Sequence, residues 1–106
     1  MSKFTILQAN GGNFFAKEMD ISKFSRIADI ECESIDEAYS LSQNIDSFWL
    51  ENKQVTVYPY SEYQKAARST SVGDIVHSNE EDKYYMVENV GFSEVKIENS
   101  KICKIP

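Results

Sequence analysis

The chain has 106 residues, and seventeen Asp and Glu against eleven Lys and Arg leave a formal net charge of −6. Its 42% hydrophobic and 12% aromatic residues suit one packed globular domain over residues 1–106 and argue against intrinsic disorder. The negative charge argues against general binding to nucleic acid or to an anionic membrane surface, because both depend on Lys and Arg. The sequence has no apolar run near the roughly 20 residues of a membrane span and no signal-peptide pattern, so we expect a cytoplasmic protein.

Two cysteines, Cys32 and Cys103, lie far apart in the sequence, without a CxxC pair or a neighbouring histidine. This usage predicts two reduced, partly buried thiols, although a disulfide between them stays open. A zinc site needs about four ligands, and only His77 could join the cysteines as a soft donor. We therefore expect neither a metal site nor a cofactor.

Two strands are predicted in the first third of the chain. Residues 4–8 indicate a short strand, and the Asn-Gly-Gly-Asn sequence at 10–13 indicates a hairpin turn. Residues 25–33 alternate between apolar and polar side chains, as in a half-buried strand. One face of this strand carries Ala28, Ile30 and Cys32, and the other carries Asp29, Glu31 and Glu33.

A helix is predicted over residues 34–45. Ser34 lies three residues before Glu37, which is the spacing of a capping box. The apolar stripe of this helix comprises Ile35, Ala38, Leu41 and Ile45. The Ser-Phe-Trp-Leu stretch at 47–50 is expected to pack beneath the helix. Residues 55–58 then predict a strand that Pro59 stops, which completes a β-α-β passage.

The second half of the chain predicts a series of hairpins. Residues 61–67 form either a short helix or an ordered loop, and Gly73-Asp74 marks a turn directly before the β-branched pair Ile75-Val76. The polar run 77–83 predicts a hairpin loop. Residues 84–90 predict the returning strand, broken by Gly91-Phe92, with further strands at 94–98 and around Ile102 and Ile105. In the strand predicted at 84–90, Tyr84, Met86 and Val90 share one face, and Tyr85 and Val87 share the other.

These elements predict an α+β fold with a mainly antiparallel sheet, one principal helix at about 34–45 and a C-terminal hairpin-rich section.

Five carboxylates in nine residues form the strongest charge feature of the sequence: Asp29, Glu31, Glu33, Asp36 and Glu37. They form either a solvated face beside a well-capped helix or a surface that meets a basic protein partner. Metal binding by these groups is disfavoured, because carboxylates that alternate on a strand lack the geometry of a calcium loop. A second acidic run at 80–82 either joins them in one field or lies on another side of the domain.

His77 is the only histidine, so any general base acting near neutral pH would begin there. The sequence has no G-x-S-x-G and no other nucleophile motif. We therefore predict that the protein is not an enzyme and that His77 is an exposed loop residue.

The aromatic residues around Pro59 offer an alternative binding surface. It comprises Tyr58, Tyr60, Tyr63, Lys65 and Arg68. These side chains could stack and contact a single-stranded nucleic acid, or they divide between the core and a wet rim. Only two bases stand there, which makes a weak electrostatic groove for nucleic acid.

Residues 68–76 read RSTSVGDIV, and Tyr85 and Val90-Gly91-Phe92 follow. The hydroxyls of residues 69–71 could cap the turn, and Arg68 could bind a phosphate or a carboxylate. The pattern resembles small proteins carried by plasmids, phages and other mobile elements, in which RS-x-SVGD-[VI]-[VI] precedes a strand that ends in G-[FW]. The resemblance covers residues 68–92 and implies a mobile-element accessory protein rather than a particular chemistry.

The sequence thus leads to a main functional hypothesis and an alternative, and a small enzyme built on His77 with a carboxylate stays open as a third class. The main hypothesis is a non-enzymatic interaction protein of a mobile element, which binds a host or element protein through the acidic surface. In one concrete version, it inhibits a factor that handles nucleic acid. The alternative is a small nucleic-acid-binding module that uses the tyrosines and bases of 58–68.

Overall fold

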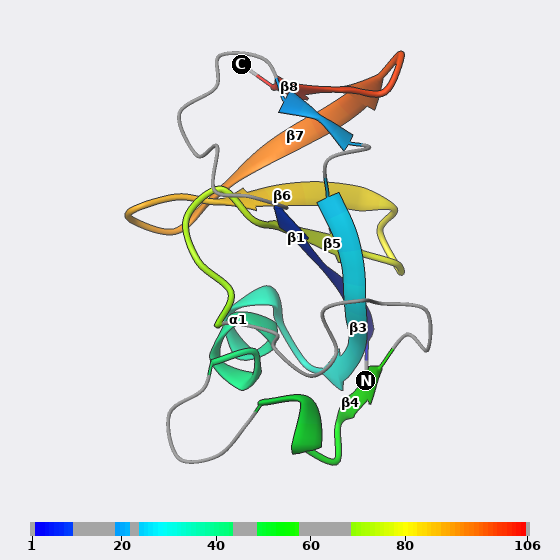
Figure 1. The fold of residues 1–106 in the computed structure, drawn as a ribbon, viewed down its shortest axis with the longest axis vertical. Helices are drawn as coiled ribbons and strands as arrows, with labels where there is room; N and C mark the ends of the chain where they lie inside the picture. Colours follow the sequence, from blue (N-terminus) through cyan, green and yellow to red (C-terminus); the bar gives the residue numbers. More distant parts are fainter. Residues whose placement is uncertain (1, 10–18, 22–23, 44–48, 58–68, 106) are drawn as a thin grey trace.

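The computed structural model describes residues 2–9, 19–21, 24–43, 49–57 and 69–105 (Figure 1). Within these ranges the chain forms an eight-stranded sheet, one α-helix and one short 3-10 helix. The strands are β1 (Ser2–Ala9), β2 (Met19–Asp20), β3 (Phe24–Cys32), β4 (Val55–Val57), β5 (Ile75–Ser78), β6 (Lys83–Val87), β7 (Phe92–Glu98) and β8 (Lys101–Lys104). The helices are α1 (Ile35–Leu41) and η2 (Trp49–Glu51). This is the predicted combination of a mainly antiparallel sheet with one principal helix, dominated by the sheet.

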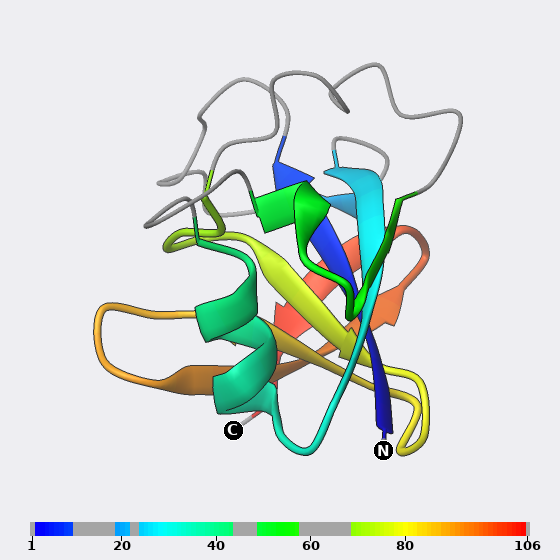
Figure 2. The same cartoon turned by 90° about the horizontal axis from the view of Figure 1, so that it is seen from below.

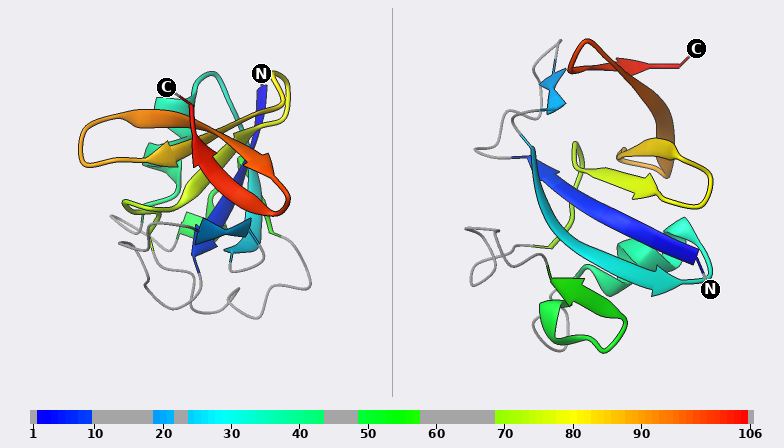
Figure 3. Two further views of the ribbon diagram at one scale, coloured as in Figure 1. Left: turned by 90° about the horizontal axis from the view of Figure 1, so that it is seen from above. Right: turned by 90° about the vertical axis from the view of Figure 1, so that its right-hand side faces the viewer.

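The sheet is antiparallel throughout and curls back on itself. Its strand order is β2-β8-β7-β6-β5-β1-β3-β4. Residues 19–20 and 24–32 are close in sequence, yet β2 pairs with β8 while β3 pairs with β1 on the far side of the sheet. Just after β2, the N–H of Ile21 donates to the carbonyl of Ser100 at 2.8 Å. β2 and β3, which are neighbours in the sequence, therefore pair with strands near opposite edges of the sheet. The curl of the sheet is visible in Figure 3.

The curled sheet separates two hydrophobic clusters. The first lies between the sheet and the two helices and includes Ile30, Ala38 and Trp49, all fully buried. The second draws on β1, β3 and β5 to β7 and includes Leu7 and Val95. Neighbouring side chains of a strand point to opposite faces, so β1 supplies Ile6 to the first cluster and Leu7 to the second.

The predicted alternation on β3 is confirmed. Ala28, Ile30 and Cys32 are fully buried, whereas Glu31 is exposed. A β-bulge interrupts the register, because Ile6 lies opposite Ala28 while Leu7 lies opposite Arg26. The predicted turn at 10–13 lies outside the described residues.

The N-terminus of the helix is confirmed, and its predicted end at residue 45 is wrong. The Ser34 hydroxyl accepts a hydrogen bond from the Glu37 N–H at 3.2 Å, which makes Ser34 the N-cap. The helix ends at Leu41, and Ser42 is its C-cap.

The end of α1 is fixed by contacts that helical periodicity does not reveal. The Ser42 hydroxyl and the Gln43 amide both donate to the carbonyl of Tyr39, at 2.9 and 3.1 Å. The Gln43 amide also donates to the carbonyl of Thr70 at 2.8 Å. Polar side chains thus satisfy a terminal carbonyl of the helix and tie its end to a distant segment.

β3, α1 and β4 form the predicted β-α-β passage, and the two strands are adjacent and antiparallel. Trp49 packs in the cluster beneath the helix, as predicted for the 47–50 stretch. Residues 47, 48 and 58 lie outside the described part of the chain.

The SVGD sequence forms the predicted turn into β5. The Asp74 N–H donates to the carbonyl of Ser71 at 3.0 Å, and the Asp74 carboxylate accepts from the Ser71 N–H at 2.8 Å. Gly73 adopts φ +93°, a region that suits glycine in a turn. The turn is joined to β6, because Gly73 N–H donates to the Val87 carbonyl and Val87 N–H donates to the Asp74 carbonyl, both at 2.9 Å. The motif therefore has a structural role in this fold.

The predicted hairpin loop over 77–83 is too long. His77 and Ser78 belong to β5 and Lys83 begins β6, because cross-strand pairing with β1 and β6 extends both strands beyond their apolar residues.

The returning strand is shorter than predicted. β6 ends at Val87, so Tyr84 and Met86 share one face as expected, but Val90 lies in the β6–β7 turn and is 92% exposed. β7 already begins at Phe92. Ile105 follows the last strand and donates its N–H to the Glu94 carbonyl. No helix in the described ranges is long and apolar enough to cross a membrane.

Candidate functional site

The five predicted acidic residues lie on two sides of the sheet. Asp29 and Glu31 lie on the face of β3 opposite to the side chains that pack under α1. Asp36 and Glu37 belong to the first turn of α1, and the exposed Glu33 connects the strand to the helix. Asp29 is half-buried, and its Oδ1 accepts a hydrogen bond from the Thr5 hydroxyl at 2.6 Å. Asp29 is therefore held by β1, while Glu31, Glu33 and Asp36 face solvent.

The turn between β5 and β6 lies at the same end of the sheet. Ser2 pairs with Cys32, and the Asn79 N–H donates to the Lys3 carbonyl at 3.0 Å. The Ser2 hydroxyl also donates to the Glu80 carboxylate. Figure 2 shows the start of β1, the β3–α1 connection and the β5–β6 turn along one side of the molecule. Residues near 33 and near 80 thus share one end of the fold.

We call this region the acidic end. Its carboxylates are Glu31, Glu33, Asp36, Glu37, Glu80, Glu81 and Asp82. Two lysines accompany them in the described ranges, Lys3 opposite Glu31 in the β1–β3 register and Lys83 at the start of β6.

The ionisation of nearby groups reflects this negative field. Burial and the charge of Glu81 raise the pKa of Tyr85. The Glu94 carboxylate, 3.5 Å from the Lys83 ammonium, raises the pKa of that lysine and offsets its charge. The acidic end therefore presents mainly negative charge, which favours a positively charged partner.

The alternative surface cannot be placed in the same way. Its residues, Tyr58, Tyr60, Tyr63, Lys65 and Arg68, lie outside the described residues.

Comparisons of the chain with protein-family models, curated proteins and solved structures find no match. The candidate sites are therefore described from the residues and contacts of this chain, without residue roles taken from a relative.

His77 is a strand residue, and the prediction of an exposed loop histidine is wrong. Its side chain is 17% exposed, and its ring stacks on Tyr84 with centroids 4.1 Å apart and planes at 9°. Nε2 lies 3.0 Å from Asp82 Oδ1. The cross-strand pairing of His77 with Tyr84 produces this stack.

The described residues hold no group of three or more His, Cys, Asp or Glu arranged to bind a metal ion.

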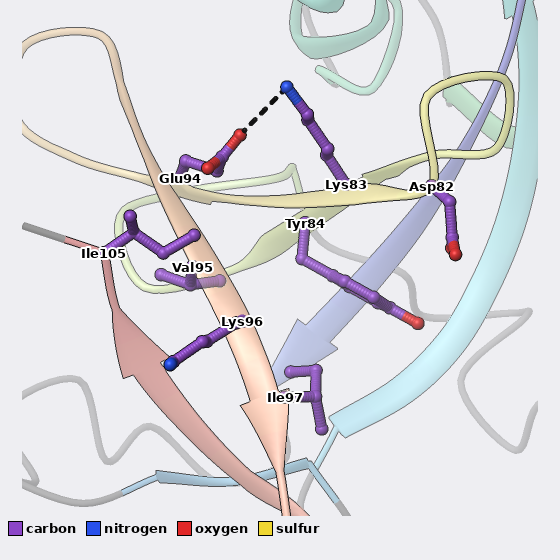
Figure 4. Close-up of a pocket in the computed structure, with 8 residues that line it drawn as sticks. All are labelled: Asp82, Lys83, Tyr84, Glu94, Val95, Lys96, Ile97 and Ile105. Atoms are coloured by element: carbon purple, nitrogen blue, oxygen red, sulfur yellow. Dashed lines mark ion pairs between the residues drawn. The ribbon is translucent and has the colours of Figure 1, made fainter.

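An open cavity of about 350 Å³ lies beside β6 and β7 (Figure 4). Val95 and Ile97 contribute apolar surface, and the ion-paired Lys83 and Glu94 also line the cavity. Lys96 also lines it and pairs with Glu98 at 3.1 Å. Both lysines of this cavity are thus paired with carboxylates, which makes the cavity a poorer site for an anionic ligand.

The two thiols are expected to differ in reactivity. Both cysteines are free, but Cys32 is buried whereas Cys103 is half-buried. Burial raises the pKa of Cys32, and the charges of Glu37 and Glu33 add to this effect, so the reactive thiolate is suppressed. A thiol-specific reagent should modify Cys103 first in the folded protein and both cysteines equally in urea.

The raised pKa of Cys32 also fixes the sign of its pH effect. The neutral thiol is favoured in the folded chain, so this contribution to the free energy of unfolding is present below the ordinary pKa of 9.0 and is lost as the pH rises through the higher pKa of the folded state.

In the experiment with the thiol reagent, faster modification of Cys32 than of Cys103 in the folded protein would contradict the burial of Cys32 in β3.

Proposed function

We propose that this chain is a non-enzymatic interaction protein that binds a protein with a basic surface through its acidic end. The observation that supports this proposal is the convergence of two acidic runs, near 31–37 and at 80–82, on one end of the sheet. Opposite charge on two surfaces speeds their encounter and disfavours wrong partners.

The chemistry of the acidic end favours a partner whose basic surface contacts nucleic acid. Such surfaces carry Lys and Arg spaced to meet phosphates, and an array of carboxylates can occupy the same groups. The resemblance of residues 68–92 to mobile-element proteins agrees with a host or element factor as the target. Inhibition of a nucleic-acid-handling factor is the concrete form of this proposal.

Affinity capture from a lysate of the host cell tests the proposal. Immobilised protein should retain a specific basic protein at low salt and release it as the salt concentration rises, because screening shortens the reach of exposed charges to about 10 Å at 0.1 M. Failure to retain any specific protein at low salt would count against the proposal.

A parallel titration with fluorescent single-stranded DNA and RNA distinguishes the nucleic-acid alternative. The proposal predicts that any binding to either nucleic acid has a dissociation constant above about 0.1 mM, which is the weak end of the range for non-specific binding. Substantially tighter binding would favour the 58–68 segment as the working surface instead.

A further inference from the structure

A second cavity, of about 120 Å³, lies on the inner side of the curled sheet. Four strands, the residue after β2 and Asn79 of the β5–β6 turn contribute to its lining, in which the strand residues include Thr5, Leu7, Arg26, His77 and Tyr84. Leu7, Ile21 and Tyr84 also belong to the second hydrophobic cluster, so the cavity borders the core. The pairing of Ile21 with Ser100 places it beside the short β2–β8 contact that brings the sheet back on itself.

Arg26 brings a guanidinium group to this cavity. The β-bulge places Arg26 opposite Leu7, so both side chains lie on the same face of the sheet, where Leu7 is buried and Arg26 is exposed. Within the described ranges Arg26 forms no ion pair with a carboxylate. Two acidic side chains near the cavity are engaged elsewhere, since Asp29 accepts from Thr5 at 2.6 Å and Asp82 holds His77 at 3.0 Å.

The polar wall opposite Arg26 is held in place by its own contacts. The Asn79 amide, which also lines the cavity, donates to the Thr5 hydroxyl at 2.8 Å. His77 is fixed by its stack on Tyr84 and by Asp82. These side chains need little reorganisation to receive a ligand, which lowers the entropic cost of binding.

The size and composition of the cavity restrict the ligand. Pockets for drug-sized molecules measure roughly 300–1,000 Å³, so this one suits only a compact group. The planar guanidinium fork matches the two oxygens of a carboxylate or a phosphate, and the apolar side chains of Leu7 and Ile21 suit a short hydrocarbon part. We infer that the cavity is a binding site for a small molecule with one oxyanion group, which Arg26 binds while His77 and Tyr84 form the adjacent wall.

Proton NMR of the single histidine offers a direct test. Sodium phosphate and sodium propionate are titrated separately at constant pH and ionic strength, and the imidazole C–H resonances of His77 are followed. A saturable shift with phosphate, propionate or both is expected, and the probe that binds identifies the oxyanion. The absence of a saturable shift with either probe overturns the inference.

Variants of Arg26 separate binding at the cavity from general ionic effects. Arg26→Gln should weaken the interaction roughly tenfold or more, because it removes a charged hydrogen-bond donor, and Arg26→Lys should retain part of it. Lys53→Gln removes an exposed positive charge that does not line the cavity and should leave the titration unchanged. If the wild type, Arg26→Lys and Arg26→Gln all bound the anion with the same affinity, Arg26 would not be the anion-binding residue and the inference would be contradicted.

Discussion

Replacement of Trp49 by alanine is expected to lower the free energy of unfolding by about 3–5 kcal/mol, the usual cost of truncating a large buried aromatic side chain. Trp49 is fully buried and lies in the cluster that joins η2 and α1 to the sheet. Small domains have roughly 5–15 kcal/mol of stability in total, so the variant should lose a large part of it. Urea unfolding followed by far-UV circular dichroism measures the change, since the substitution removes the only tryptophan.

Val90→Ala is the matched control for Trp49. Val90 is 92% exposed in the β6–β7 turn, and exposed substitutions usually change stability by no more than about 0.5 kcal/mol. A Trp49→Ala variant as stable as Val90→Ala would contradict the packing of η2 beneath the helix.

The second large effect is expected at Asp74, where alanine should lower the free energy of unfolding by about 2–3 kcal/mol. The side chain is fully buried and accepts the Ser71 N–H at 2.8 Å. Its removal leaves that donor without its carboxylate and loosens the turn that is hydrogen-bonded to Val87 of β6. The same urea titration detects the loss.

Asp82→Ala is the control for Asp74. The Asp82 side chain is 85% exposed, and its pair with His77 is a surface pair of the kind that contributes about 0–1 kcal/mol. If the two variants unfolded at the same urea concentration, the structural role assigned to the SVGD turn would be wrong.

Local patterns predicted much of the fold. Alternation identified the buried face of β3, because the side-chain period of a strand is two and one face of β3 packs on the core. The spacing of Ser34 and Glu37 identified the start of α1, because N-capping depends on residues only three positions apart.

Long-range pairing explains where the sequence predictions failed. The helix ends early because Ser42 and Gln43 form hydrogen bonds that involve Thr70, far away in the chain. His77 lies in a strand because β1 and β6 pair on both sides of β5. The pairing of β2 with β8 at the edge of the curled sheet involves a strand of two residues, which is too short to give a periodic signal.

The candidate sites were predicted to different degrees. The carboxylates of 29–37 and 80–82 were evident as charge runs, but the shared end of residues 31–37 and 80–82 follows from the β1–β3 register and from the contacts of residues 79 and 80. Arg26 was missed because the β-bulge and the curl, rather than a motif, bring it to the same cavity as His77. Its one sequence signal is a base within a strand otherwise rich in apolar and acidic residues.

Matched charge reversals test the acidic end most directly. Glu33→Lys and Glu81→Lys each change one exposed carboxylate of the acidic end, whereas Glu98→Lys makes the same change at the end of β7. Capture of the basic partner by each variant, at equal protein concentration and low salt, is the measurement. The account predicts that Glu33→Lys and Glu81→Lys both lose the partner while Glu98→Lys retains it. Equal retention by all three variants would contradict a binding role for the acidic end.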